Sequence, residues 1–414
     1  METCKLQPPF PSPPIIGISS KKANTLPMIS RFPKHLGLQL AKQNLLNEAE
    51  KGFEKNLACS PLSIATMMNM LTAGSSKHGL KDRLSSLGCE TMDELDNQSL
   101  QLLDVVSSKD TWKTGDPLLT FANGCWIDQR FSLKPSFTEI LQNIYKVEPK
   151  ALDFENNKGD VVEKVNSWVN NETKGLIKEI LKNLDDQTAL ILANALYFKG
   201  VWEDPFVVKM TKDDKFYLLN GEEVEVPFMY KKSGIHLYGS FDGFKVLKLP
   251  YKNKQDQRQF SMYFYLPDER DGLKNLLQQL NPNSEFLKHQ LMLKTKFIRN
   301  IRIPKFKFPY DFDVSKVIGS LGLAQPSIVL HSPDGNEVVG PPTAIEHKAH
   351  IEVNEMGTEA AAVTCSFIAG CAQFQQPPPP LTFKADHPFM FMIMEDMSRI
   401  PLFVGAVVNP LLET

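Results

Sequence analysis

The sequence predicts one domain of the α+β class, and three observations support this prediction. Residues 36–50 and 61–73 carry apolar residues at helical spacing, and the second segment is apolar nearly all round. Residues 188–197 form an almost continuous apolar run, which is typical of a strand buried on both faces. No stretch between Arg31 and Pro410 resembles a linker, so residues 31–414 are expected to fold as a single domain.

The first 30 residues are expected to be a disordered extension. They are rich in Pro and Ser and contain one acidic residue, Glu2. They lack the charged start, apolar run and small-residue cleavage site of a secretory signal, and they show no amphipathic arginine pattern of a transit peptide. We therefore expect a cytoplasmic protein.

Composition argues against several functional classes. The formal net charge is -2, whereas nonspecific nucleic-acid binding needs a basic face. No run of 18 apolar residues occurs, so no membrane span is expected. The cysteines have no disulfide or metal-site spacing, and we expect neither a metal nor another cofactor; they stand at positions 4, 59, 89, 125, 365 and 371. Cys59 and Cys125 lie in apolar surroundings and are expected to be small core residues.

The N-terminal half is expected to contain most of the helices. Ser60 and Pro61 form a helix start, because Ser is a good cap and Pro is tolerated at the first helical position. That helix should end at Gly74. An amphipathic helix with a break near Gly175 is expected over residues 160–181. Residues 75–116 should be helical in part, and residues 118–127 should form a strand.

The C-terminal half is expected to consist mainly of strands. Residues 210–231 indicate hairpins around Asn220-Gly221, which is a strong turn dipeptide. Further strands are expected over residues 260–267, 297–308, 387–394 and 400–408, with a short helix over 313–324. Within the strand 188–197, Asn194 is the one strongly polar side chain. An unpaired buried amide costs about 1–3 kcal/mol, so this side chain must bind another group.

The stretch from Glu346 to Thr382 combines a strand with a tract of small residues. Residues 347–353 alternate like a strand, and Gly357 then frees the backbone to change direction. At a period of two, one face of the following tract is uniformly small: Thr358, Ala360, Ala362, Thr364 and Ser366. The other face carries Glu359, Ala361, Val363, Cys365 and Phe367. Such a strand could slide between two existing strands, and Pro377–Pro380 should keep the following arm extended and solvated.

Several segments together resemble the serpins, and plant serpins most closely. The resemblance is carried, in chain order, by NLACSPLSIATMMNML, TALILANALYFKGVWEDPF, GFKVLKLPY, IPKFKF, NEMGTEAAAVT and ADHPFMFMIMEDMSRIPLFVGAVVNP. It spans residues 31–410. It implies an α+β fold with three β-sheets, about nine helices and an exposed reactive-centre loop at about 355–380. Because many serpins are extracellular, that compartment is the alternative to the cytoplasm.

The resemblance also implies a mechanism. A target protease would cut the Cys371-Ala372 bond and form an acyl-enzyme. The hinge would then let Thr358–Cys371 enter the sheet as a new strand, which at about 3.3 Å per residue moves the protease roughly 46 Å. The hinge residues are Glu355, Gly357, Thr358, Glu359, Ala360, Ala361, Ala362 and Val363. The chain would then be a monomeric inhibitor and not an enzyme.

Two further sets of residues take roles from the resemblance. Ser60, Ser63, Asn194 and His347 match the shutter cluster, a polar group beneath the sheet that opens. Trp202 and Lys305 match the breach, where the loop first enters the sheet, and Lys305 should pair with Glu355 there. The amphipathic helix over 160–181 should lie across the front of this sheet and so be a candidate gate.

Target specificity and the rival functions stay open. Cys371 is small and neutral, which favours an elastase- or chymotrypsin-like serine protease, with a papain-like cysteine protease as the alternative. An exposed thiol there could also be a redox-sensitive site. Cys365 or Cys371 with His347, His350 or His387 is only superficially a catalytic set, since nothing nearby lowers the thiol pKa. A binding or storage protein that proteases merely cut is the stronger rival.

Overall fold

The computed structural model describes residues 36–107, 117–253, 258–280, 285–313, 318, 327–340, 344–358 and 380–412. The chain divides after Arg31, and every described residue belongs to the unit Phe32–Thr414. Within the described ranges, no helix has both the length and the apolar character needed to cross a membrane.

The largest sheet has nine strands, and its core is aromatic and aliphatic. Its order is β1-β18-β17-β9-β8-β7-β10-β16, with β6 paired to β7. The strands are β1 (Leu57–Cys59), β6 (Lys212–Tyr217), β7 (Glu223–Phe241), β8 (Phe244–Pro250), β9 (Phe260–Pro267), β10 (Lys294–Pro304), β16 (Thr382–Lys384), β17 (Phe389–Glu395) and β18 (Ile400–Val407). The strands expected over 260–267, 387–394 and 400–408 are confirmed within two residues at their ends.

The second sheet has six strands in the order β11-β14-β15-β5-β2-β4, and it positions the candidate site. Its strands are β2 (Leu118–Asp128), β4 (Lys150–Leu152), β5 (Leu190–Val201), β11 (Phe306–Asp313), β14 (Ala344–Asn354) and β15 (Gly357–Thr358). β5 is buried along almost its whole length, as its apolar run predicts. The third sheet joins β3 (Ser132–Leu133), β12 (Ile328–His331) and β13 (Glu337–Gly340).

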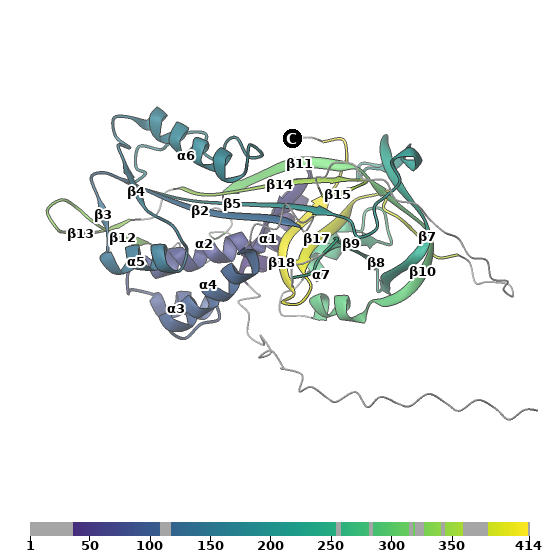
Figure 1. Ribbon diagram of the computed structural model, residues 1–414, viewed down its shortest axis with the longest axis horizontal. Helices are drawn as coiled ribbons and strands as arrows, with labels where there is room; N and C mark the ends of the chain where they lie inside the picture. Colours follow the sequence, from purple (N-terminus) through teal and green to yellow (C-terminus); the bar gives the residue numbers. More distant parts are fainter. Residues whose placement is uncertain are drawn as a thin grey trace, which may run out of the picture. The chain divides into compact units, whose positions relative to one another are not determined.

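Helices cover both faces of the six-stranded sheet. The described helices are α1 (Leu36–Glu50), α2 (Pro61–Ala73), α3 (Leu80–Ser86), α4 (Met92–Val106), α5 (Pro135–Asn143), α6 (Lys158–Glu172) and α7 (Leu273–Gln279), with 3₁₀ turns at Val208–Met210 and Glu285–Met292. α6 lies on one side of β2, β5 and β14, and α2 lies on the other (Figure 1). The two hydrophobic clusters agree, because α2 packs with Leu190 and Leu192 whereas α6 packs with Ile191 and Ala193.

The predicted start of α2 is confirmed. Ser60 caps the helix by accepting a hydrogen bond from the Ser63 amide at 3.0 Å, and Pro61 follows at the first helical position. Its residues from Pro61 to Thr72 are all buried, as expected of a helix that is apolar all round. The helix predicted over 313–324 lies outside the described residues, except for Ile318.

The break predicted near Gly175 is confirmed, but the chain does not resume a helix between it and Leu181. α6 ends at Glu172, and Lys174 and Gly175 both have positive φ angles, 53° and 89°. Two successive left-handed residues stop a right-handed helix. Residues 173–181 instead fold back against α6, so the apolar residues beyond Gly175 belong to a return segment and not to the helix.

Candidate functional site

The chain re-enters the six-stranded sheet at the start of the C-terminal loop. β14 runs parallel to β5 from Ala344 to Ala349, and the two strands then separate. After β14 ends, the chain turns and β15 returns between them, antiparallel to both. Thr358 lies opposite Val353 on one side and Gly200 on the other. Gly357 and Thr358 therefore already occupy a slot between β14 and β5.

Glycine is required at the mouth of this slot. Gly357 has a φ of 151°, and a Cβ atom there would lie 2.0 Å from the carbonyl oxygen of Gly200. Any larger residue would clash with the backbone of β5. Gly357 thus serves a close approach between strands as well as the change of direction that the sequence suggested.

Thr358 is held inside the slot by a tyrosine. Its side chain is buried, with 2% of the residue exposed, and its Oγ1 lies 2.7 Å from the Tyr251 hydroxyl. The Tyr251 ring stacks on Trp202 with ring centroids 4.6 Å apart. Burial raises the pKa of Tyr251 well above its ordinary value, so the phenol stays neutral and able to donate. A charged side chain at position 358 would have no compensating partner in these surroundings.

Trp202 and Phe206 fix the turn that precedes the slot. The Trp202 indole donates to the Asn354 carbonyl at 3.0 Å, and its backbone amide donates to the Met356 carbonyl at 2.8 Å. The Phe206 amide donates to the Glu355 carbonyl, also at 2.8 Å. Three consecutive carbonyls of the turn are thus bound by the segment that follows β5.

Glu355 is enclosed at the same turn. Its side chain is 8% exposed; Oε1 accepts from Thr211 Oγ1 at 2.8 Å, and Oε2 lies 3.1 Å from Lys305 Nζ. Burial opposes the charge, but hydrogen bonds from its own backbone amide, Thr211 and Lys305 outweigh it and hold the pKa of Glu355 below its usual range. The pairing of Lys305 with Glu355 is therefore as expected, and the Glu355 carboxylate is largely enclosed.

The residues matching the shutter cluster lie farther along the sheet. Backbone register pairs His347 with Asn194, and the Asn194 Nδ2 donates to Asn123 Oδ1 at 2.7 Å. Among the described residues, two buried oxygens of this region have no hydrogen-bond partner: Ser63 Oγ and Asn194 Oδ1. The side chain of His347 lies outside the described part of the structure. Within the described part of the structure, Ser63 Oγ and Asn194 Oδ1 are therefore available to accept a hydrogen bond.

Some of the predicted site residues are described and others are not. Glu355, Gly357, Thr358, Trp202 and Lys305 come together at the slot. Glu359, Ala360, Ala361, Ala362, Val363, Cys371 and Ala372 lie outside the described residues. Sequence reasoning missed Tyr251, Thr211 and Asn123, because each acts on a residue that is distant in the chain and none carries a local signal.

α6 packs against the part of β5 that β15 does not reach. Val161, Val165 and Val169 are fully buried against β5, and the side chain of Asn166 holds the return segment. Asn166 Oδ1 accepts from the amides of Ile180 and Leu181, and its Nδ2 donates to the Leu181 carbonyl. Helix and return segment are therefore one packed unit over the sheet.

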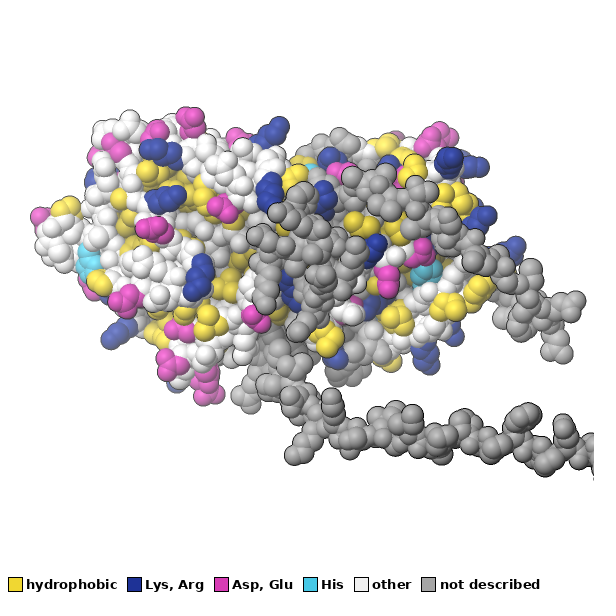
Figure 2. Space-filling model, viewed as in Figure 1, with side chains coloured by type: hydrophobic (Ala, Val, Ile, Leu, Met, Phe, Trp, Pro, Cys, Tyr) yellow, Lys and Arg dark blue, Asp and Glu magenta, His cyan; other side chains and the backbone are white. Residues whose placement is uncertain are grey.

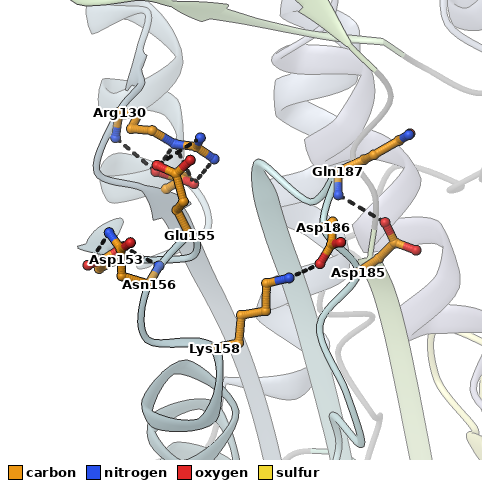
Figure 3. Close-up of polar contacts among 9 residues, drawn as sticks. Arg130, Asp153, Glu155, Asn156, Lys158, Asp185, Asp186 and Gln187 are labelled. Carbon is orange, nitrogen blue, oxygen red and sulfur yellow. Dashed lines mark hydrogen bonds and ion pairs between the residues drawn. The ribbon is translucent and has the colours of Figure 1, made fainter.

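Polar contacts join the start of α6 to the end of the sheet where β5 begins and β2 ends. Lys158, at the start of α6, bonds Asp186 in the turn before β5 (Figure 3). Arg130 binds Asp128 with its Nε and Nη2 and reaches Glu155 with Nη1 at 3.2 Å. The contacts of Lys158 with Asp186 and of Arg130 with Glu155 are largely exposed, so each adds little to stability, whereas the side chain of Asp128 is buried.

The described cysteines are poor nucleophiles. Cys59, Cys89 and Cys125 are buried, and burial raises the pKa of Cys59 and of Cys125 to about 12. The expectation that Cys59 and Cys125 are core residues is confirmed. The imidazole of His387 is engaged by Asp386 and by the Pro267 carbonyl, both at 3.0 Å.

Comparisons with known proteins agree with this geometry. A family model described as serpin (serine protease inhibitor) matches residues 33–410. Serpin-Z2B of Triticum aestivum is 42% identical over 369 residues, which cover 87% of this chain and 91% of that protein. Serpin-ZX of Arabidopsis thaliana is 39% identical over 385 residues, which cover 91% and 97%.

Solved structures give the same result. Arabidopsis AtSerpin1 in its native stressed conformation has a TM-score of 0.77 at 37% identity, covering 91% of this chain and 99% of that one. Thyroxine-binding globulin in complex with thyroxine has a TM-score of 0.75 at 22% identity, covering 92% and 99%, which is a likeness of fold alone.

Proposed function

The chain belongs to the serpin family, whose members at this level of similarity are serpin-type protease inhibitors, and we propose that it is an active inhibitor. Its target would be a serine endopeptidase, with a papain-like cysteine protease as the alternative. After attack at Cys371-Ala372, the acylated loop would enter the sheet between β14 and β5 and carry the protease with it. Trapping would follow because the deformed protease cannot complete hydrolysis.

The observation that carries this proposal is the register of β15. Thr358 lies opposite Val353 and Gly200. Continued in the same register, Thr364 would lie opposite His347 and Asn194, which are already paired with each other in the parallel ladder. The new strand would therefore fit without sliding β14 or β5 along its own axis. It would also bring the Thr364 hydroxyl to the row that contains the unpartnered Asn194 Oδ1.

The two faces of the incoming strand also suit their surroundings. Residues of even number would face the core beneath the sheet, as Thr358 does, and from Ala360 to Ser366 all of them are small. Residues of odd number would face α6, where Val363, Cys365 and Phe367 would add apolar area next to Ala195, Ala193 and Ile191. Glu359 would lie opposite Lys199, an opposite-charge cross-strand pair.

A binding or storage protein of the same fold is the rival. Thyroxine-binding globulin shows that this fold also occurs in a protein with a bound small molecule. The small residues along the inner face favour the inhibitor, because a strand that never enters the sheet has no need of them.

A protease panel with one substitution tests the proposal. The panel contains pancreatic elastase, chymotrypsin and papain, and complexes that survive SDS are detected on gels. We expect the parent to form such a complex and Thr358→Arg to be cut at the same bond without forming one, because a buried unpaired charge disfavours insertion. Thr382→Arg is the matched control, since Thr382 is exposed on β16 at the other end of the loop.

The outcomes separate the alternatives. Simple cleavage of the parent by every protease of the panel supports the binding or storage protein. A stable complex with Thr358→Arg means that insertion is not how the protease is held.

A further inference from the structure

A buried lysine lies behind the segment that holds the turn over residues 354–356, which we call the hinge turn. Lys231 and Lys232 are adjacent on β7, but Lys232 is exposed whereas the side chain of Lys231 is 10% exposed. Lys231 stands opposite Ile301 of β10, so its backbone belongs to the nine-stranded sheet. A buried ammonium group is costly unless other groups compensate its charge, so its partners carry information.

The partners of Lys231 belong to one segment, residues 202–206. Its Nζ lies 3.0 Å from Asp204 Oδ2 and also donates to the Asp204 carbonyl. The same atom stands over the Phe206 ring, 5.0 Å from the ring centroid. Burial lowers the pKa of Lys231 below its ordinary value, although the charge and the hydrogen bond of Asp204 oppose this shift. Three contacts of one ammonium group thus tie this segment to β7.

The same segment binds the backbone of the hinge turn. Trp202 and Phe206 donate to the three carbonyls of that turn, and Asp204 lies between them in the chain. The hinge turn joins β14 to β15 of the six-stranded sheet, whereas Lys231 belongs to the nine-stranded sheet. Lys231 therefore fastens to one sheet the segment that holds the hinge turn of the other.

We propose that Lys231 is a positioning residue for insertion of the loop, and that it acts by fixing segment 202–206 against β7. The inference rests on the proposed function, because it concerns how many of the attacked chains trap the protease. After attack, insertion competes with hydrolysis of the acyl-enzyme. Ordering a backbone costs conformational entropy, so a turn that is ordered before cleavage leaves less to order during this competition. Without the ammonium group, the hinge turn is looser, insertion begins later and more chains are released cleaved.

Hydrogen exchange tests the first step, which is the hold on the hinge turn. Lys231→Met keeps an unbranched apolar side chain, removes the ammonium group and leaves the half-exposed Asp204 carboxylate in contact with water. We expect exchange at the Trp202 and Phe206 amides, which donate to the hinge turn, to become about tenfold faster or more. Exchange is measured at single residues by NMR in the uncleaved chain, so this test needs no protease.

The fate of the attacked chains tests the second step. The protease of the panel that attacks the parent fastest is used, and the ratio of cleaved chain to SDS-resistant complex is measured on gels. We expect this ratio to rise about fivefold in Lys231→Met. Asp204→Asn should raise it less, because the carbonyl bond and the ring contact remain, and should add nothing to Lys231→Met in the double variant. If Lys231→Met does not fold, Asp204→Asn carries both measurements.

Lys248→Met is the matched control. Lys248 is a second largely buried lysine, with its Nζ 2.8 Å from Asp396 Oδ2 and 5.3 Å from the Tyr263 ring centroid, and it lines the same hollow as Lys231. Its ion pair fastens the turn after β17 and not segment 202–206. Lys232→Met controls for a lost surface charge, since Figure 2 shows charged side chains of both signs where Figure 1 shows β7 and β10. Both controls should leave exchange at the two amides and the ratio within about twofold of the parent.

The outcomes separate this proposal from the proposed inhibition. Unchanged exchange at the two amides in Lys231→Met overturns the positioning role, and so does an equal change in Lys248→Met. Faster exchange with an unchanged ratio also overturns it, because the hold on the turn then has no effect on insertion. A parent that forms no complex with any protease of the panel refutes the proposed inhibition instead, and exchange alone then decides whether Lys231 fixes the hinge turn.

Discussion

The start of the loop is secured by side chains from distant parts of the sequence. Thr358 is bound by Tyr251, 107 residues earlier, and Glu355 by Thr211, 144 residues earlier. Each bond joins a buried polar atom of the loop to the sheet framework, so breaking one leaves its partner unsatisfied. The native position of the hinge is therefore set by a few identifiable atoms.

Tyr251→Phe removes the hydroxyl that holds Thr358. We expect a loss of about 0.5–1.5 kcal/mol of native stability and more inhibitor consumed per protease trapped, because a hinge that leaves the slot begins insertion later. The stoichiometry of inhibition and the melting temperature are the two measurements. Tyr265→Phe is the control, since it removes another buried hydroxyl, which accepts from Gln290 away from the loop. Equal stoichiometry in both variants would argue against a positioning role for Tyr251.

The depressed pKa of Glu355 predicts that its contribution to native stability decreases at acidic pH. Its folded pKa is depressed, so its stabilising contribution is present above the unfolded value of about 4.3 and is lost as the pH falls through the lower folded value. The melting temperature of Glu355→Gln should be below that of the parent at pH 7, and the difference should shrink as the pH falls below about 4.3.

Glu139→Gln, at an exposed position on α5, is the control for this titration. A difference between the parent and Glu355→Gln that stays constant from pH 7 to pH 3 would mean that the carboxylate charge contributes nothing at the hinge.

Sequence reasoning pointed to Gly357 and Thr358 but not to the side chains that hold them. Gly357, Thr358 and the small face are local patterns, and so are the caps and apolar runs of α2 and β5. Tyr251 ends an apolar strand motif, and nothing near it in the sequence indicates that its hydroxyl meets a threonine. Pairing across the sheet depends on how β8 and β15 come together, which no short window of sequence contains.

At the scale of elements, the segment after α6 shows that apolar residues at helical spacing beyond Gly175 do not indicate a helix. Ile177, Ile180 and Leu181 continue the apolar spacing of the helix, yet their backbone is not helical. The side chain of Asn166 binds the Ile180 and Leu181 amides that a continued helix would have bonded internally. An amphipathic pattern indicates which residues are buried but not their backbone conformation. Here Ile177, Ile180 and Leu181 are buried because the segment after Gly175 folds back against α6.

Asn166→Ala should loosen the return segment from α6. Two amides and one carbonyl lose their partner, so we expect a destabilisation of about 1–3 kcal/mol and at least about tenfold faster hydrogen exchange at Ile180 and Leu181. Exchange measured at single residues by NMR or mass spectrometry checks this. Asn171→Ala, at an exposed position of the same helix, should leave both amides protected. Unchanged protection in Asn166→Ala would show that apolar packing alone holds the segment.

At the scale of the whole molecule, the six-stranded sheet has a parallel pair where the new strand would enter. β11–β14 and β5–β2 are antiparallel, whereas β14–β5 is parallel. A strand entering between β14 and β5 in the direction of β15 would replace this parallel pair by two antiparallel ones. Antiparallel pairing is slightly more stable per residue, and the number of ladder bonds rises as well. Insertion at this position would thus add pairing that the parallel β14–β5 pair does not provide.

Cleavage of the loop should therefore raise the melting temperature. Ten residues, Glu359 to Ile368, would pair along the remaining length of β5 down to Leu190. At about 1 kcal/mol of net gain for each residue, the cleaved chain gains about 10 kcal/mol. At about 2 °C per kcal/mol, scanning calorimetry should find it melting about 20 °C above the intact protein. Thr358→Arg cut at the same bond should melt near the intact parent, because its first residue cannot pass the slot beside Tyr251. If the cleaved parent melts no higher than the intact chain, the loop does not enter the sheet, and the gap between β14 and β5 is a feature of the fold with no part in inhibition.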